Sequence, residues 1–166
     1  TQPLAGCLGC RACYETGRCF RDDKVNEFID KIEDVDGFVF GTPVHYASAS
    51  GAITSFMDRA FYSGSRFMKG KPAASIVSCR RGGASATFDQ MNKYFTINQM
   101  PVISSQYWNS IHGNTPEEVQ QDLEGLQVMR TLGENMAWII RCIEAGKAVG
   151  IEFPVKEPGV RTNFIR

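Results

Sequence analysis

The 166-residue sequence lacks the features that direct a protein to nucleic acid or to a lipid bilayer. Eighteen Lys and Arg residues balance eighteen Asp and Glu residues, so the formal net charge is zero and nothing attracts a polyanion. No apolar run approaches the roughly 20 residues that a membrane-spanning helix needs. The sequence also has no internal repeat and no low-complexity tract. We therefore expect no nucleic-acid partner and no membrane partner, and the composition is typical of a cytoplasmic protein.

The sequence has enough apolar residues for one sizeable core. Apolar residues make up 43% of the chain, which includes 11 Phe, 5 Tyr and 2 Trp. A chain of this length is typical of a single domain. We expect one globular domain over residues 1–166, with a cysteine loop at residues 7–19 and an aperiodic C-terminal tail at residues 146–166.

Cysteines are concentrated in one short stretch, and this stretch restricts the chemistry more than any other feature. Cys7, Cys10, Cys13 and Cys19 follow the spacing C-x2-C-x2-C-x5-C. Four thiolates this close in sequence can surround one inorganic centre, and the intervening glycines allow backbone N–H groups to turn toward bound sulfides. Bacterial ferredoxins use a similar run that ends in C-x3-C-P, but here the last spacer is longer and no proline follows. The quartet predicts one four-iron four-sulfur (4Fe-4S) cluster.

Three other interpretations of the quartet remain open. Structural zinc usually takes two cysteine pairs separated by a dozen or more residues, and this sequence has no such gap. Disulfides and free thiols are the second and third alternatives. The two remaining cysteines, Cys79 and Cys142, lie in apolar surroundings and are predicted to be small buried hydrophobic residues.

Helical and strand patterns alternate after the cysteine loop. A continuous apolar run at residues 38–40 predicts a strand buried on both faces, and a helix begins near Ser50. Thr115 to Glu118 form a capping-box pattern that predicts one long helix to about Ala145. The other expected elements are a helix opened by Asp22 and Asp23, strands at 73–78 and 102–104, and a helix around 88–95.

Such alternation is typical of an α/β fold with a parallel sheet covered by helices on both faces. Parallel sheets bind ligands beyond the carboxyl ends of their strands. Two predicted loops, 42–49 and 78–84, follow strands that we expect to be adjacent. The first offers an aromatic ring and small residues suited to a flat heterocycle. The second offers backbone N–H groups and arginines suited to a carbonyl edge or a developing anion.

The order of these motifs resembles a known family. The cysteine run, then Asp22-Asp23, then Thr42-Pro43-Val44-His45-Tyr46 and Phe56-Met57-Asp58-Arg59, is similar to the flavodoxin-like iron-sulfur flavoproteins and NADPH-dependent FMN reductases. The resemblance covers nearly the whole chain. It implies a flavodoxin-like three-layer α/β sandwich, FMN as cofactor, and a 4Fe-4S cluster in those members that carry the cysteine motif.

The resemblance also implies which residues bind each cofactor. The cluster ligands would be Cys7, Cys10, Cys13 and Cys19. One segment would wrap the FMN ring, and it consists of Thr42, Pro43, Val44, His45, Tyr46, Ala47 and Ser48. A second segment would contact the other edge of the ring, and it consists of Cys79, Arg80, Arg81, Gly82 and Gly83. Within these segments His45 is either a flavin hydrogen-bond partner or a simple surface residue, and no catalytic residue is assigned.

The sequence departs from the family pattern at its start. Family members have a strand, a phosphate-binding loop, a helix and a second strand ahead of the cysteine motif, and here three strands are predicted where the fold needs five. We therefore expect an N-terminally incomplete domain whose first strands and FMN phosphate site lie outside this sequence. Such a chain would expose an apolar strand edge and aggregate when it is alone.

The predicted function is that of an FMN-dependent oxidoreductase or electron-transfer flavoprotein. NAD(P)H or a ferredoxin would supply electrons, and the cluster would relay single electrons. Two alternatives remain: a cluster-free NAD(P)H-dependent flavin or quinone reductase, and a non-catalytic binding module stapled by zinc. The apolar segments around Trp108 and at Phe61-Tyr62 predict a homodimer or homotetramer. Trp108 and His112 are expected in a loop after the third strand.

Overall fold

The structure is a computed structural model that describes residues 3–164. Its elements, in chain order, are α1 (Cys13–Thr16), α2 (Lys24–Ile29), β1 (Phe38–His45), β2 (Ser48–Ala49), α3 (Gly51–Met68), β3 (Ala73–Cys79), α4 (Ala84–Ile97), β4 (Ser110–His112), α5 (Pro116–Val119) and α6 (Leu123–Ala148). The predicted α/β class is confirmed.

The strands form one sheet in the order β2-β1-β3-β4. β1 and β3 pair in parallel from Phe38 opposite Ala73 to Pro43 opposite Ser78, and β3 pairs in parallel with β4. The short β2 pairs antiparallel with the last two residues of β1. The carboxyl ends of β1, β3 and β4 therefore meet at one edge of the sheet.

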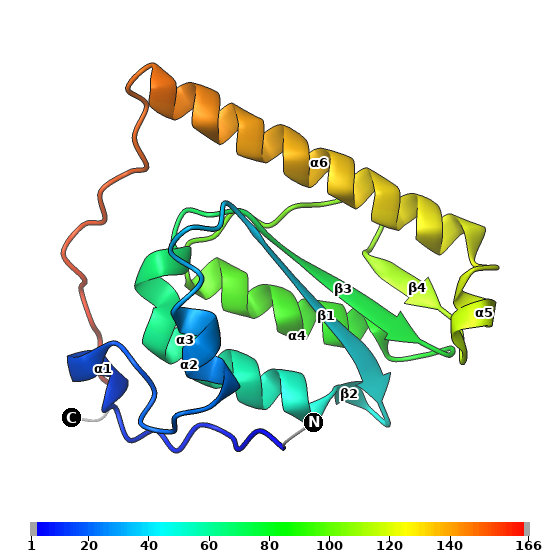
Figure 1. Cartoon of the computed structure of the whole chain (residues 1–166), viewed down its shortest axis with the longest axis horizontal. Coiled ribbons are helices and arrows are strands. Elements are labelled where there is room, and N and C mark those ends of the chain that lie inside the picture. The colour runs from blue at the N-terminus through cyan, green and yellow to red at the C-terminus, as the bar shows by residue number, and fades with distance from the viewer. Residues whose placement is uncertain (1–2, 165–166) are drawn as a thin grey trace.

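Helices cover the sheet on both faces and give three layers (Figure 1). On one face, Phe38 and Phe40 of β1 pack with α2, α3 and α4 in the larger apolar cluster, which includes Met57 and Phe95. On the other face, Ala74 of β3 packs with Leu132 and Met136 of α6 in a smaller cluster. Alternation of side chains along β3 thus supplies both halves of the core, with Ala73 in the larger cluster and Ala74 in the smaller one.

The strand at residues 38–40 is buried on one face only, so the prediction of burial on both faces is wrong. Phe38 and Phe40 are buried, but Val39 between them is 53% exposed. The apolar contacts of α6 on this face are with β3 and not with β1, which leaves Val39 uncovered.

The predicted third strand is also displaced. Residue Val102 makes one isolated bridge to Ala73, and the strand itself is formed by Ser110–His112. His112 is therefore a strand residue and not part of a loop, whereas Trp108 precedes β4 and is exposed, as expected for a loop residue. Val102 and Ile103 predict a strand by their β-branched side chains, but Ile103 packs in the smaller apolar cluster with Leu132 and Met136 of α6 instead.

The helix predicted after Thr115 is two helices. Thr115 caps α5 by accepting a hydrogen bond from the Glu118 backbone N–H, but α5 ends at Val119. Asp122 then caps α6, where its carboxylate accepts from the Gly125 backbone N–H. The same carboxylate accepts the His112 backbone N–H, so this second cap fastens β4 to α6.

The end of the chain follows the prediction only in part. α6 ends at Ala148, and residues from 149 to 164 form no helix or strand. Phe153 of this tail packs against Gly70, whose added Cβ would come within 2.9 Å of the ring. Cys142 on α6 is exposed, so its predicted burial is wrong. Within the described residues, no helix is long and apolar enough to cross a membrane.

Candidate functional site

The carboxyl end of β1 leads through the short strand β2 into helix α3. β1 continues through His45, so residues 42 to 45 belong to a strand and not to the loop that was predicted. Tyr46 follows in a left-handed conformation with φ of 58° and a fully exposed side chain, and the chain then returns as β2. The Ser50 backbone N–H donates to Thr42 Oγ1 at 3.1 Å, which ties the end of β1 to the N-terminus of α3.

The second predicted ligand segment lies against the first. Gly83 has φ of 87° and is the N-cap of α4. A Cβ added to it would approach Val44 Cγ1 to 2.8 Å and the Ala47 carbonyl oxygen to 3.8 Å. The predicted proximity of segments 42–49 and 78–84 is thereby confirmed. Arg80, Arg81 and Gly82 are exposed.

Cys79 ends β3 and faces the neighbouring strand. Its Sγ lies 3.4 Å from Nδ1 of His112 on β4. Burial raises the pKa of the Cys79 thiol above its usual range, so the neutral thiol is the form present near neutral pH. The structure thus places Cys79 within the strand-end site but buried, unlike the exposed arginines that follow it.

The cysteine loop forms a second part of the site, on the α2–α3 side of the molecule. α1 ends at Thr16, and its C-cap Gly17 is left-handed with φ of 71°, a conformation that favours glycine. The Arg66 guanidinium lies close by, within 2.6 Å of the position that a Cβ on Gly17 would take. The turn brings the chain back and places Cys19 across from the first three cysteines.

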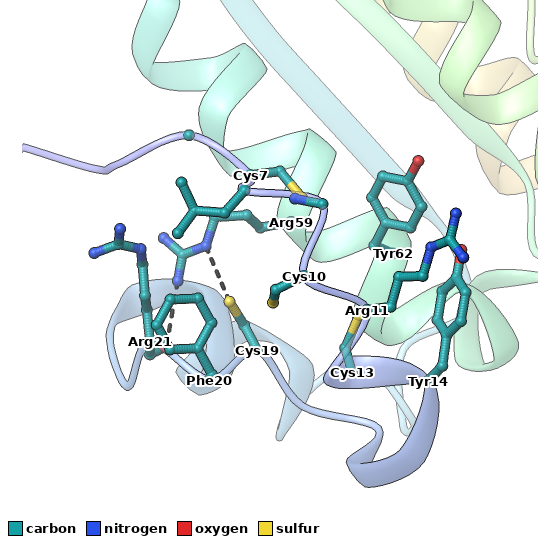
Figure 2. A pocket seen from close by; sticks show the side chains of 13 residues that line it. Cys7, Cys10, Arg11, Cys13, Tyr14, Cys19, Phe20, Arg21, Arg59 and Tyr62 are labelled. Atoms are coloured by element: carbon teal, nitrogen blue, oxygen red, sulfur yellow. Dashed lines mark hydrogen bonds between the residues drawn. The ribbon is translucent and has the colours of Figure 1, made fainter.

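The four predicted ligands line one cavity of about 190 Å³. Figure 2 shows the sulfurs of Cys10, Cys13 and Cys19 around a common space, with Cys7 on the far rim. Phe20, Tyr14 and Tyr62 supply apolar wall, and Arg59 enters from α3. The structure therefore brings together all four residues that were singled out as ligands.

Hydrogen bonds hold both ends of the quartet. The Gly9 backbone N–H donates to Cys7 Sγ at 3.4 Å, and Arg59 Nε donates to Cys19 Sγ at 3.2 Å. The buried Asn26 side chain bonds both backbone groups of Cys19, with each distance at 2.9 Å. N–H groups aimed at cysteine sulfur are what thiolate ligands of iron-sulfur clusters receive.

Burial and the neighbouring cysteines act against a free thiolate at Cys13. Burial, together with the charge of Cys19, Cys7 and Cys10, raises the pKa of the Cys13 thiol. Four thiolates with no metal between them repel one another, whereas a positively charged iron core compensates them.

The cavity fits a cluster in the chemistry of its donors. Among residues 3–164, no three or more His, Cys, Asp or Glu side chains converge closely enough to hold a single metal ion. A cluster of four irons is larger than one ion, and its thiolates attach at separate corners. Four sulfurs distributed around one cavity, two of them with N–H donors, match that requirement.

The two parts of the site share helix α3. Ser50 caps this helix next to the strand ends, and Arg59 lies nine residues further along. At 1.5 Å per residue the two positions are separated by about 13 Å along the axis. One rigid element thus fixes the spacing of the cysteine cavity from the strand-end segments.

The family is decided by comparison of the whole sequence. The sequence profile of the NADPH-dependent FMN reductase family matches residues 3–115, more than half of the chain. The chain belongs to this family. Membership supports FMN as the cofactor and a flavin-dependent oxidoreductase or electron-transfer function.

Curated relatives carry the name iron-sulfur flavoprotein. One from Methanocaldococcus jannaschii is 30% identical over 85% of this chain and 77% of its own length. A second protein of that organism is 27% identical over 75% of this chain and 69% of its own length. The predicted resemblance to iron-sulfur flavoproteins is confirmed.

Solved structures establish the flavodoxin-like fold. An archaeal flavodoxin superposes with a TM-score of 0.50 at 18% identity, and the match covers 68% of this chain and 71% of the flavodoxin chain. RosB, solved with 8-demethyl-8-formylriboflavin-5'-phosphate, superposes with a TM-score of 0.57 at 15% identity, over 89% of this chain and 69% of its own. At such identities the likeness shows the fold alone.

The residues that support the quartet were not predicted from the sequence. Arg59 was noted only as part of a family motif, and Asn26 was not noted at all. Arg59 had one signal: it is a charged residue beside the apolar positions Met57, Ala60 and Phe61 of an amphipathic helix. Asn26 carried none, because its two bonds to Cys19 depend on the turn that only the folded loop forms.

Proposed function

We propose that this protein is an FMN-dependent oxidoreductase that passes electrons between NAD(P)H or a ferredoxin, FMN and a 4Fe-4S cluster. The observation that carries the proposal is the cavity lined by Cys7, Cys10, Cys13 and Cys19, found in a chain of the FMN reductase family. The relatives named iron-sulfur flavoprotein support it.

The proposed FMN site is the carboxyl edge of the sheet. Thr42 to Ser48 would lie along the ring, with exposed Tyr46 beside it, and Cys79 to Gly83 would face its other edge. The close approach of Gly83 to Val44 supports a single continuous surface formed by both segments. Flavin supplies the hydride and single-electron chemistry when bound, and the protein's role is to hold and orient it.

The proposed cluster site is the cysteine cavity. Cys7, Cys10, Cys13 and Cys19 would each provide one thiolate, and Gly9 and Arg59 would donate hydrogen bonds to two of those sulfurs. Iron-sulfur clusters exchange one electron at a time, which is the chemistry that this site would add to the flavin.

The decisive experiment is anaerobic purification followed by an absorption spectrum and measurement of FMN, iron and acid-labile sulfide. We expect one FMN and four irons per chain. Tyr46→Asp should weaken FMN binding because it places an unpaired carboxylate beside the ring. Protein without flavin absorbance after incubation with excess FMN would contradict the flavin site.

Serine substitutions test the cysteine site separately. Cys10→Ser should remove or destabilise the cluster, since the serine hydroxyl is a poorer ligand for this iron than thiolate. Cys142→Ser on α6 is the matched control and should leave iron content unchanged. FMN without iron or sulfide after reconstitution would leave the cluster-free reductase, which needs only the strand-end segments.

A further inference from the structure

Arg59 is a buried cation beside the cysteine cavity, and each nitrogen of its guanidinium donates a hydrogen bond. The residue is 2% exposed, in the middle of helix α3. A buried charge is costly unless it is paired and hydrogen-bonded. Its partners therefore show what the charge is positioned to do.

A carboxylate fixes the plane of the guanidinium. Arg59 Nη1 donates to Asp23 Oδ2 at 2.7 Å and Nη2 donates to Asp23 Oδ1 at 2.8 Å. The same two nitrogens also donate to the carbonyl oxygens of Ala5 and Arg21. A two-point bond of this kind sets the orientation of the whole planar group.

The remaining N–H points at a cysteine. With both terminal nitrogens held by Asp23, Nε lies 3.2 Å from Cys19 Sγ (Figure 2). The backbone of Cys19 is held as well, because the Asn26 side chain on α2 binds both its N–H and its carbonyl. Two helices thus hold the donor and the acceptor in register.

We propose that Arg59 is a positioning residue that acts through Cys19 to raise the reduction potential of the bound cluster. The inference rests on the proposed function, because it requires that the quartet holds iron. Reduction adds one negative charge to the cluster. A cationic N–H donor at one thiolate stabilises the reduced state more than the oxidised state, and hydrogen bonds to sulfur are a recognised determinant of cluster potential.

The neutral variant should make the cluster harder to reduce. For Arg59→Gln in the full chain, we expect the equilibrium constant for one-electron reduction to fall about tenfold. For a one-electron couple this is a shift of about 59 mV to lower potential. The measurement is an anaerobic redox titration followed by the electron paramagnetic resonance signal of the reduced cluster.

Arg130→Gln is the matched control. It removes the same charge from an exposed position on α6 that does not line the cysteine cavity. We expect its cluster potential to equal that of the wild type, because solvent screens an exposed charge.

Two further variants separate tuning from simple support of the loop. Asp23→Asn keeps a capping side chain on α2 but removes the negative charge that compensates Arg59, so the potential should rise. Arg59→Lys keeps the charge but lacks the planar fork that serves Asp23 and Cys19 together, so its potential should lie between the wild type and Arg59→Gln. If Arg59 and Asp23 only supported the loop, Arg59→Gln and Asp23→Asn would not shift the cluster potential in opposite directions.

Each outcome has one interpretation. Opposite shifts in Arg59→Gln and Asp23→Asn support the tuning role. Iron-loaded variants with the wild-type potential overturn it and leave the proposed cluster standing. Wild-type protein without iron overturns the proposed cluster itself. If Arg59→Gln fails to fold, Arg59→Lys and Asp23→Asn give the same test.

Discussion

Tyr94 and Asp58 form a polar contact inside the helical layer that has a measurable pH signature. Tyr94 Oη donates to Asp58 Oδ1 at 2.5 Å, between α4 and α3. Burial is the main cause that raises the pKa of the Tyr94 phenol well above its usual value, and the hydrogen bond to Asp58 adds to it. The bond therefore stabilises the fold only while the phenol keeps its proton.

We expect Tyr94→Phe to lower the free energy of unfolding at neutral pH by about 1–3 kcal/mol, the usual cost of losing a hydrogen bond to a charged group. The unfolded phenol ionises near pH 10, before the folded one. The stabilisation is thus complete below about pH 10 and is lost as pH rises above it. Urea unfolding of both proteins between pH 7 and 11 checks this. A difference that stays constant across that range would contradict it.

At the level of single residues, the sequence indicated the candidate ligands better than the residues that support them. The cysteine quartet is visible because its spacing in the chain is itself the chemical signal. Arg59 acts on Cys19 across 40 positions, so no local spacing records the contact. His112, 33 residues from Cys79, was assigned to a loop for the same reason, because the pairing of β3 with β4 places it.

Among the elements, the junction between β1 and α4 depends on a glycine. Gly83 begins α4 with a left-handed backbone and contacts Val44 at the end of β1. Gly83→Ala would force a Cβ into that contact and strain the backbone. We expect a loss of about 1–3 kcal/mol in the free energy of unfolding and weaker FMN binding.

The neighbouring glycine provides the control. A Cβ on Gly82 would meet no atom within 4 Å, so Gly82→Ala should change stability by less than about 0.5 kcal/mol. Thermal unfolding of the two variants without added FMN measures this difference. If both variants were destabilised equally, the close approach to Val44 would not be the reason that glycine is needed at position 83.

Elements with a strong local pattern were predicted well, and elements defined by their partners were not. Helix α3 has a Ser50 cap and a clear apolar stripe, and it begins where expected. β4 has three residues and one buried side chain, too little pattern to compete with the more apolar triplet at 102–104. The break between α5 and α6 depends on the Asp122 cap, which the continuous apolar stripe of the sequence conceals.

For the whole molecule, exposed aromatic residues just before β4 predict self-association. Tyr107 and Trp108 are 59% and 56% exposed and contact each other with ring centroids 5.1 Å apart. Phe61, which was expected to share this role, is instead buried in the core. We expect a homodimer or homotetramer that buries the Tyr107-Trp108 pair.

Light scattering at micromolar concentration should give a multiple of the monomer mass, and Trp108→Glu should shift it toward the monomer. Trp138→Glu is the matched control, because Trp138 is 63% exposed but lies on α6. A wild-type protein that is monomeric throughout this concentration range would rule out the assembly.

The attachment of the cysteine loop has an evolutionary consequence. Between Cys7 and Cys19 only Gly17 is buried, and Cys19 alone of the four cysteines packs against the margin of the larger apolar cluster. The loop is fastened from outside by Asn26, Arg59 and the backbone at Gly17, while the sheet and its helices are assembled without it. Point mutations that remove or restore these thiols would leave the sheet and its helices unchanged, so under the proposed function one lineage of this fold would accommodate chains with the cluster and chains without it.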